Sequence, residues 1–345
     1  MSQHAGLFDR EKRQKKLLAT KDFLDRVNRF VTWETFRPVL DATLQRPGNA
    51  KGGRPPYDAV LMFKVLVLQA LYNLSDEETE YQILDRQSFM HFLGLELQDA
   101  VPDARTLWLF RETLRKAGAV ENLFAQFNGM LEAHGFKASG GQMIDATFVE
   151  VPRQRNNRDD NKHIKETGEA PENWSEKKAA HKDVDAEWTK KNNVSFYGYK
   201  NHANVDRQHK IIRRYTVTGA SVHDSQELDN VLDPNNDSKD LWADSAYRSE
   251  DQEERLKEQG YTSRIHERAY RNKPLTEEQK ASNSGKSSVR VRVEHVFGHI
   301  ETSMNGCFVR TIGIARATAK IGLENLAYNI SRFTFLKTKG QTAPT

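Results

Sequence analysis

Three acidic residues in the second half of the chain have the surroundings of a metal-dependent active site. Asp145 lies within the apolar, β-branched run 142–151, where an ionised carboxylate is costly without a cation or donors beside it. Asp244 directly follows a strand-like apolar run, and α/β proteins place ligands at such carboxyl ends. Glu294 lies in the segment 289–300, whose apolar residues share one face of a helix. Asp145 and Asp244, each taken alone, are equally well explained as a surface, turn or capping residue, and Glu294 alone is better explained as a surface residue of a helix.

Together the three acids predict a site for hard metal ions. Their separation along the chain leaves room for two strands and a later helix to converge. Three convergent carboxylates, in a chain whose one cysteine is Cys307, suit Mg²⁺ or Mn²⁺. Two such ions about 3.5–4 Å apart stabilise both the attacking and the leaving oxygen of a phosphodiester displacement. The acids therefore indicate chemistry on nucleic acid.

Basic and aromatic residues extend this interpretation. The bases near the acids, which we expect to hold a nucleic-acid backbone, are Lys200, Arg248, Arg290 and Arg292. The chain has 52 Lys and Arg against 48 Asp and Glu, yet bases far outnumber acids within residues 302–345. Such a basic end suits a polyanionic partner, or is an ordinary solvated surface. Trp174 and Trp188 are candidates for stacking on an extruded base, with ordinary packing as the alternative.

Composition excludes several other classes of protein. A single cysteine permits neither an intrachain disulfide nor a cysteine-based zinc site, and the histidines fit no zinc signature. No GxxxxGK[ST] run supports a nucleotide-hydrolysing loop. The longest apolar run, 59–72, is too short to span a bilayer, and the polar N-terminus lacks the apolar core of a signal peptide. We expect a soluble, cytoplasmic protein without a membrane segment.

Hydrophobic periodicity predicts a helical first part and a mixed α/β second part. Helices are expected over 59–74, after the cap Ser75 and after the cap Asp103; they could form a helix-turn-helix DNA reader or only pack together. Strands are expected at 142–151, 196–200, 211–218, 240–244 and 261–266, and helices at 225–232, 249–259 and from 289 onward. The predicted divisions are a helical, basic segment 1–50, a helical DNA-binding domain 51–137, a catalytic domain 138–337 with a polar insertion 153–196, and a tail 338–345. A turn at 46–48 and a basic, glycine-rich linker at 51–56 mark the first boundary.

Short segments from about residue 54 to residue 335 resemble those of one enzyme family. They are Arg54–Asp58, Leu66–Ser75, Val101–Asp103, Ile144–Thr147, Tyr197–His202, His223–Ser225, Ala243–Tyr247 and Arg292–Gly298. On these segments the chain resembles the DDE transposases of the bacterial insertion-sequence family five. The resemblance implies an RNase H-like catalytic domain, with a mixed sheet flanked by helices, in which Asp145, Asp244 and Glu294 match the three metal-binding acids. It also implies a helical N-terminal domain that helps to grip terminal inverted repeats.

The surroundings of the third acid depart from the family pattern. Related transposases often carry Tyr, Arg, Glu and Lys at a fixed spacing on the helix that contacts the cleaved strand. Here Arg290 stands in the Arg place, whereas Ser287 and Glu301 stand in the places of Tyr and Lys. Lys286 or Arg310 is the expected substitute for the phosphate contact of that lysine.

The residues and the resemblance together predict a DNA transposase. It would bind the terminal inverted repeats of an insertion sequence, cut the ends with two Mg²⁺ or Mn²⁺ ions and join the 3′-OH ends to target DNA. Asp145 would bridge both ions, with Asp244 and Glu294 completing one side each. Two ends must be held together, so we expect a homodimer on double-stranded DNA, associated with the bacterial nucleoid. The alternatives are a metal-dependent nuclease without strand transfer and a DNA-binding protein whose transposase activity has lapsed.

Overall fold

The computed structural model describes residues 12, 15–16, 22–44, 56–270 and 274–342. The chain divides into two compact units, one formed by residues 1–126 with 326–345 and the other by residues 127–325. The expected turn at 46–48, most of the linker at 51–56 and most of the basic N-terminus lie outside the described residues.

The first unit is helical, as predicted. Its elements are α2 (Phe23–Phe30), η1 (Trp33–Phe36), α3 (Arg37–Thr43), α4 (Ala59–Tyr72), α5 (Asp76–Asp85), α6 (Gln87–Leu93), α7 (Ala104–Lys116) and the first part of α8 (Ala119–Ala133). α4 is buried along most of its length and contacts α3, α5, α6 and α7, because its residues are apolar on every side. Ser75 and Asp103 cap α5 and α7, which confirms both predicted caps. Among the described residues no single helix is long and apolar enough to cross a membrane, whereas α4 and α5 together pass that test across a bend of 102°.

The second unit is built on a mixed sheet. Its strands are β1 (Gln142–Glu150), β2 (Glu187–Lys191), β3 (Val194–Asp206), β4 (Ile212–Gly219), β5 (Asp240–Trp242) and β6 (Thr262–Ser263). β3 lies antiparallel to β1 on one edge and to β2 and β4 on the other. β1, β5 and β6 are parallel neighbours. The order β4-β3-β1-β5-β6 is that of an RNase H-like sheet, which confirms the predicted fold class.

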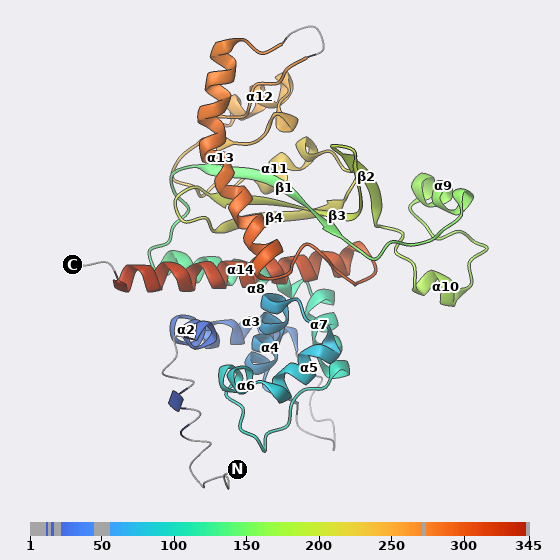
Figure 1. The fold of residues 1–345 in the computed structure, drawn as a ribbon, viewed down its shortest axis with the longest axis vertical. Helices are drawn as coiled ribbons and strands as arrows, with labels where there is room; N and C mark the ends of the chain where they lie inside the picture. Colours follow the sequence, from blue (N-terminus) through green and yellow to red (C-terminus); the bar gives the residue numbers. More distant parts are fainter. Residues whose placement is uncertain (1–11, 13–14, 17–21, 45–55, 271–273, 343–345) are drawn as a thin grey trace, which may run out of the picture. The chain divides into compact units, whose positions relative to one another are not determined.

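Helices cover both faces of this sheet. On one face, Ile144 and Leu241 pack against α11 (Leu228–Val231), which follows η2 (Asp224–Glu227), and against α12 (Glu250–Glu258), through residues such as Leu228 and Leu256. On the other face, Val149 packs against the start of α14 (Ile314–Thr342). The long helix α13 (Glu277–Ser303) contacts β1 and β5, and Figure 1 shows it crossing the strands. Both cores follow from the alternation of apolar side chains along β1.

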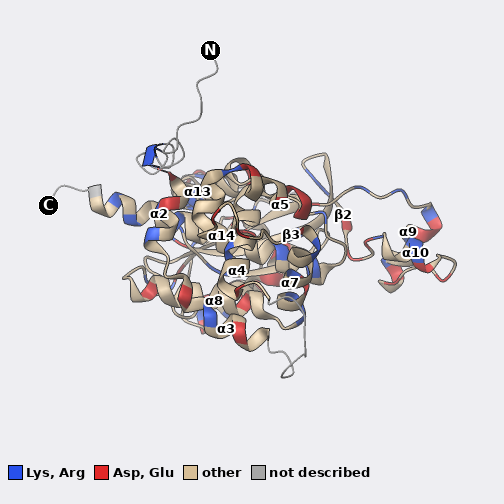
Figure 2. Cartoon of the chain, turned by 90° about the horizontal axis from the view of Figure 1, so that it is seen from below, with Lys and Arg blue, Asp and Glu red and all other residues tan. Residues whose placement is uncertain are grey.

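The polar insertion contains more structure than the sequence indicated. Two short helices, α9 (Arg158–Thr167) and α10 (Glu176–Ala180), are capped by Asn157 and Ser175, and Figure 1 shows them lying apart from the sheet. Trp174 is buried and donates from Nε1 to Oδ2 of Asp160 over 2.9 Å, so one ring organises this segment. Figure 2 shows charges of both signs on the two helices. The predicted loop is therefore a small helical module followed by β2.

A buried acid on α14 gives the second unit a pH-dependent stability. Glu324 is 2% exposed, and its Oε1 finds no hydrogen-bond partner among the described residues. Burial raises the pKa of Glu324 to about 7, against the opposing charge of Lys320. Because the pKa in the folded state lies above its usual value of 4.5, the folded state loses stability as pH rises from about 4.5 to 7.

Replacing Glu324 by glutamine should remove this loss. At pH 8 we expect Glu324→Gln to be more stable than the wild type by about 1–3 kcal/mol, because the neutral amide carries no desolvated charge. At pH 4.5 the two proteins should unfold at nearly the same urea concentration. Urea unfolding at both pH values measures the difference, and a variant that is less stable at pH 8 would contradict the assignment.

Candidate active site

The pairing of β1 with β5 brings two of the three acids to the same level of the sheet. The strands run parallel, with residues 142–143 opposite residues 241–242. Continued by two residues, this register sets Asp145 beside Asp244, on chains that lie about 4.8 Å apart. Both acids alternate with core residues such as Ile144, so they lie on the face away from α11 and α12. The predicted convergence of the two aspartates therefore has a structural basis in the strand register.

Backbone donors orient both carboxylates. Oδ1 of Asp145 accepts a hydrogen bond from the N–H of Ala146 over 2.9 Å. Oδ1 of Asp244 accepts from the N–H of Ala246 over 2.7 Å and so caps the 3-10 turn η3 (Ser245–Tyr247). The capping role that sequence analysis gave as the alternative for Asp244 is present together with the position beside Asp145. One oxygen of each carboxylate is thus held by the chain.

Glu294 is linked to Asp145 through an arginine. Arg290, one turn earlier on α13, donates from Nη1 to Oδ2 of Asp145 over 2.5 Å and from Nη2 to Oε1 of Glu294. Among the described residues, no three His, Cys, Asp or Glu side chains are arranged so that they could hold a metal ion as they stand. The structure therefore brings Asp145 and Asp244 together directly, and places the guanidinium of Arg290 between Asp145 and Glu294.

The positive charge near Asp145 is too small to offset the cost of burying its carboxylate. Burial raises the pKa of Asp145 to about 6, and the charge of Asp244 acts in the same direction. The guanidinium of Arg290 and the N–H of Ala146 lower that pKa, but they offset the burial only in part. A divalent cation beside Asp145 and Asp244 would reverse this penalty, so the donor set fits a hard metal ion.

A buried tyrosine next to the acids was not singled out by sequence reasoning. Tyr247 is fully buried, and its hydroxyl finds no hydrogen-bond partner among the described residues. Burial and the nearby charges of Asp145, Asp224 and Asp244 raise its pKa well above the usual value. The segment 243–247 contained the only available signal, a Tyr three residues after the acid that ends a strand.

Two of the predicted DNA-binding bases are engaged inside the protein. Lys200 is buried, and its Nζ donates to Asp224 over 2.8 Å and to the carbonyl of Val222 over 2.7 Å. Arg248 forms an ion pair with Glu267 over 2.9 Å and lies 3.7 Å from Glu253. As placed, both side chains are paired with neighbouring acids, and the DNA contacts expected of them stay predictions.

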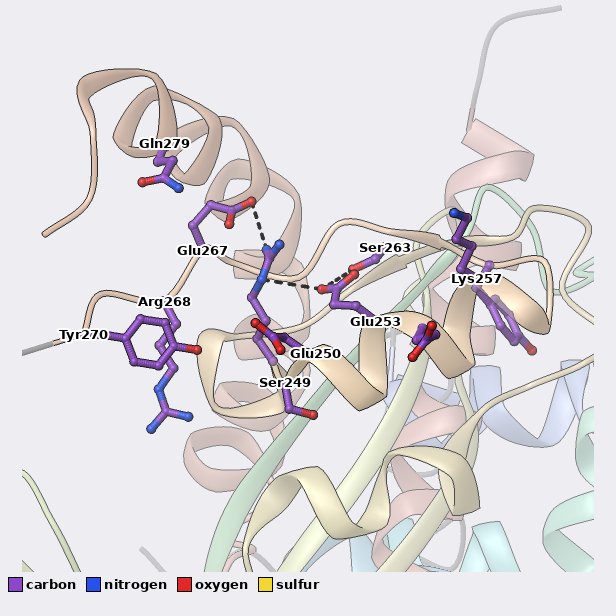
Figure 3. Close-up of a pocket in the computed structure, with 12 residues that line it drawn as sticks. Ser249, Glu250, Glu253, Lys257, Ser263, Glu267, Arg268, Tyr270 and Gln279 are labelled. Atoms are coloured by element: carbon purple, nitrogen blue, oxygen red, sulfur yellow. Dashed lines mark hydrogen bonds and ion pairs between the residues drawn. The ribbon is translucent and has the colours of Figure 1, made fainter. Parts of the chain in front are cut away.

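The same holds for one expected substitute of the family lysine. Lys286 donates to the carbonyl of Ile265 over 2.8 Å and to Glu267 over 3.2 Å. Glu267 lines a pocket of about 770 Å³ together with Arg248 and three further glutamates. Figure 3 shows Glu250, Glu253 and Glu267 in this pocket beside Lys257 and Arg268, so its lining carries charges of both signs. Lys286 is therefore engaged by a neighbouring acid, and the DNA contact expected of it stays a prediction.

The remaining predicted contacts differ in exposure. Arg292 donates to the carbonyl of Arg207 over 3.3 Å, whereas Arg310 is exposed and lies over the ring of Phe308. Trp188 is 48% exposed, but Trp174 packs inside the insertion and cannot stack on a base without leaving that position. The exposed candidates for a DNA contact are thus Arg310 and Trp188.

Comparison with known proteins assigns the chain to a family. A model described as "Transposase DDE domain" matches residues 138–330, and a model described as "Transposase domain (DUF772)" matches residues 12–113. A solved structure, described as a cryo-EM structure of a piggyBac transposase synaptic complex with hairpin DNA, is similar with a TM-score of 0.46 and 14% identity. The similarity covers 94% of this chain and 77% of that one. Because the DDE model spans more than half of the chain and includes all three acids, the protein belongs to the DDE transposases and is an enzyme of that family.

Proposed function

We propose that this transposase cuts DNA at the ends of an insertion sequence and joins the freed 3′-OH ends to target DNA. The observation that supports this most directly is the pair Asp145 and Asp244, held level on neighbouring strands by β1–β5 pairing. A pair of carboxylates in this position suits divalent metal chemistry on a phosphodiester, which is also what DDE transposases as a family use.

Two Mg²⁺ or Mn²⁺ ions are the proposed cofactors. When bound, they would activate the attacking oxygen and stabilise the leaving oxygen of the scissile phosphate. Asp145 and Asp244 would hold them through the oxygens turned away from the backbone donors, and Glu294 would contribute once Arg290 has left its carboxylate.

Double-stranded DNA, as transposon ends and as target, is the proposed partner. The unit that matches the "Transposase domain (DUF772)" model would help to bind the inverted repeats, and Arg310 and Trp188 are exposed for contacts near the site. Arg290 and Arg292 lie on α13 beside Glu294 and would contact the cleaved strand. Joining both ends at one target requires two active sites, so the proposed assembly is a homodimer on DNA.

A strand-transfer assay tests the proposal against a simple nuclease. Duplexes that end in the terminal repeats flanking the coding sequence, already cut to leave a 3′-OH, are incubated with the protein, Mn²⁺ and a supercoiled plasmid. We expect covalently joined plasmid products without ATP, because the phosphoester exchange needs no external energy source.

The matched control uses the same duplexes with a dideoxy 3′ end, which should give no joined product. Plasmid nicking that is equal with both duplexes, with no joining, would assign the protein to the nucleases. A protein that binds the ends but neither nicks nor joins would be the lapsed, DNA-binding alternative.

A further inference from the structure

The guanidinium of Arg290 lies where two of the three acids would otherwise meet. Nη1 contacts Oδ2 of Asp145 over 2.5 Å and Nη2 contacts Oε1 of Glu294. Its Nε finds no hydrogen-bond partner among the described residues. The side chain of Arg290 is 19% exposed and that of Asp145 is 13% exposed, whereas that of Glu294 is 49% exposed. The arginine therefore links an inner acid to an outer one.

This contact and metal binding by Asp145 and Glu294 compete with each other. Oδ1 of Asp145 accepts from the N–H of Ala146 and Oδ2 accepts from Arg290, so a metal ion at Oδ2 competes directly with the guanidinium. A guanidinium cannot give up its charge at any physiological pH, so it leaves a carboxylate only by moving away. A dication that binds Asp145 and Glu294 together must therefore displace Arg290.

A DNA phosphate can supply the new partner. The planar fork that fits two carboxylate oxygens fits two phosphate oxygens equally well. Arg290 is on the same helix as Arg292, and the Glu294 side of its guanidinium is the more exposed side. The side chain can thus turn outward to a backbone phosphate while its Cα stays on α13.

We propose that Arg290 is a positioning residue that couples metal binding to DNA binding. Without DNA it bridges Asp145 and Glu294 and opposes metal binding; with a phosphate bound to it, both carboxylates become available to the metal. The inference rests on the proposed function, because it takes Asp145, Asp244 and Glu294 as the metal ligands. Such coupling confines metal binding, and therefore strand cleavage, to the complex with DNA.

Titration with Mn²⁺ alone, by calorimetry on the full chain at pH 8, tests the first half of the coupling. Arg290→Gln should bind Mn²⁺ about 10-fold more tightly than the wild type, a factor within the usual range of coupling between two sites. Arg290→Lys keeps the charge but cannot bridge two acids, so its affinity should lie between the two. Equal affinity of wild type, Gln and Lys variants, each with a native circular dichroism spectrum, would overturn the proposal.

The second half is tested with a short duplex of arbitrary sequence. The duplex should raise the Mn²⁺ affinity of the wild type by about the same factor, and Mn²⁺ should raise its affinity for the duplex equally, since linkage is reciprocal. Arg290→Gln should show neither effect. A variant that responds to the duplex as the wild type does would overturn the proposal.

Two further variants separate failure of this proposal from failure of the proposed function. Arg255→Gln removes an arginine that pairs with Asp229 over 3.0 Å on α11 and α12, and it should bind Mn²⁺ as the wild type does. Asp145→Asn should lose Mn²⁺ binding with or without DNA. If Asp145→Asn binds Mn²⁺ normally, the metal site itself is wrong; if it loses binding while Arg290→Gln matches the wild type, only the coupling is wrong.

Discussion

Replacing Asp145 by asparagine is expected to abolish strand cleavage while leaving binding of the DNA ends nearly unchanged. Asparagine retains the size of the side chain and an oxygen for the N–H of Ala146, but it removes the charge that would hold a metal ion. Metal ions contribute several kcal/mol to transition-state stabilisation, which at about 1.4 kcal/mol per tenfold corresponds to a loss of about 10³-fold or more. Cleavage of end duplexes in Mg²⁺, with binding followed by gel shift, measures both effects.

The same substitution should stabilise the fold. Because burial raises the pKa of Asp145 from 3.8 to about 6, its ionised form reduces stability as pH rises through that range. At pH 7.5 and without metal, Asp145→Asn should therefore be more stable than the wild type by about 1–3 kcal/mol. A variant that is inactive but more stable distinguishes a lost ligand from a damaged fold.

Asp229→Asn is the matched control, because Asp229 also pairs with an arginine but lies on α11. It should retain cleavage in Mg²⁺ within about twofold, since surface ion pairs contribute little. If Asp145→Asn still cuts at a comparable rate, Asp145 is not a metal ligand and the proposed mechanism is wrong.

The features that could be predicted from the sequence are those whose cause lies within a few residues along the chain. The caps Ser75 and Asp103 were found because a side chain bonds to a backbone group three residues away. The placement of Asp145 in a strand, and of Asp244 just beyond the end of another, was found because each acid interrupts an apolar run. The register of β1 and β5 then brought the two together, which their positions in the chain allowed but did not require.

Features that depend on distant partners could not be predicted in this way. α13 begins at Glu277, twelve residues before the expected start, because its first half has no apolar stripe and is stabilised by the capping box of Thr276. The contact of Arg290 with Asp145 joins residues 145 positions apart, and nothing in either segment specifies it. Lys200 was expected to face DNA, but its partner Asp224 comes from a different motif. Charge alone does not distinguish a DNA contact from a buried ion pair.

A glycine in β3 is expected to be indispensable for the sheet that carries these acids. Gly198 has φ +148°, a conformation that L side chains rarely adopt, and it lies opposite Glu150 of β1 and Glu187 of β2. A Cβ atom at this position would lie 2.2 Å from the carbonyl oxygen of Val149. Because that oxygen belongs to the backbone of β1, it cannot move without breaking the β1–β3 pairing.

Gly198→Ala should therefore destabilise the protein by about 3–5 kcal/mol, in the range of the most damaging single substitutions. About 1–3 kcal/mol of this is backbone strain, and the remainder is the displacement of β1.

Gly129→Ala is the matched control, because Gly129 lies on α8 and a Cβ atom there would have no neighbour within 4 Å among the described residues. This control should gain about 0.5–1 kcal/mol, since alanine favours a helix interior over glycine. Urea unfolding of both variants gives the comparison. A Gly→Ala substitution that destabilises the protein at position 198 and stabilises it at position 129 would show that the loss at Gly198 comes from its position against β1. A Gly198→Ala protein as stable as the wild type would show that β1 tolerates the shift.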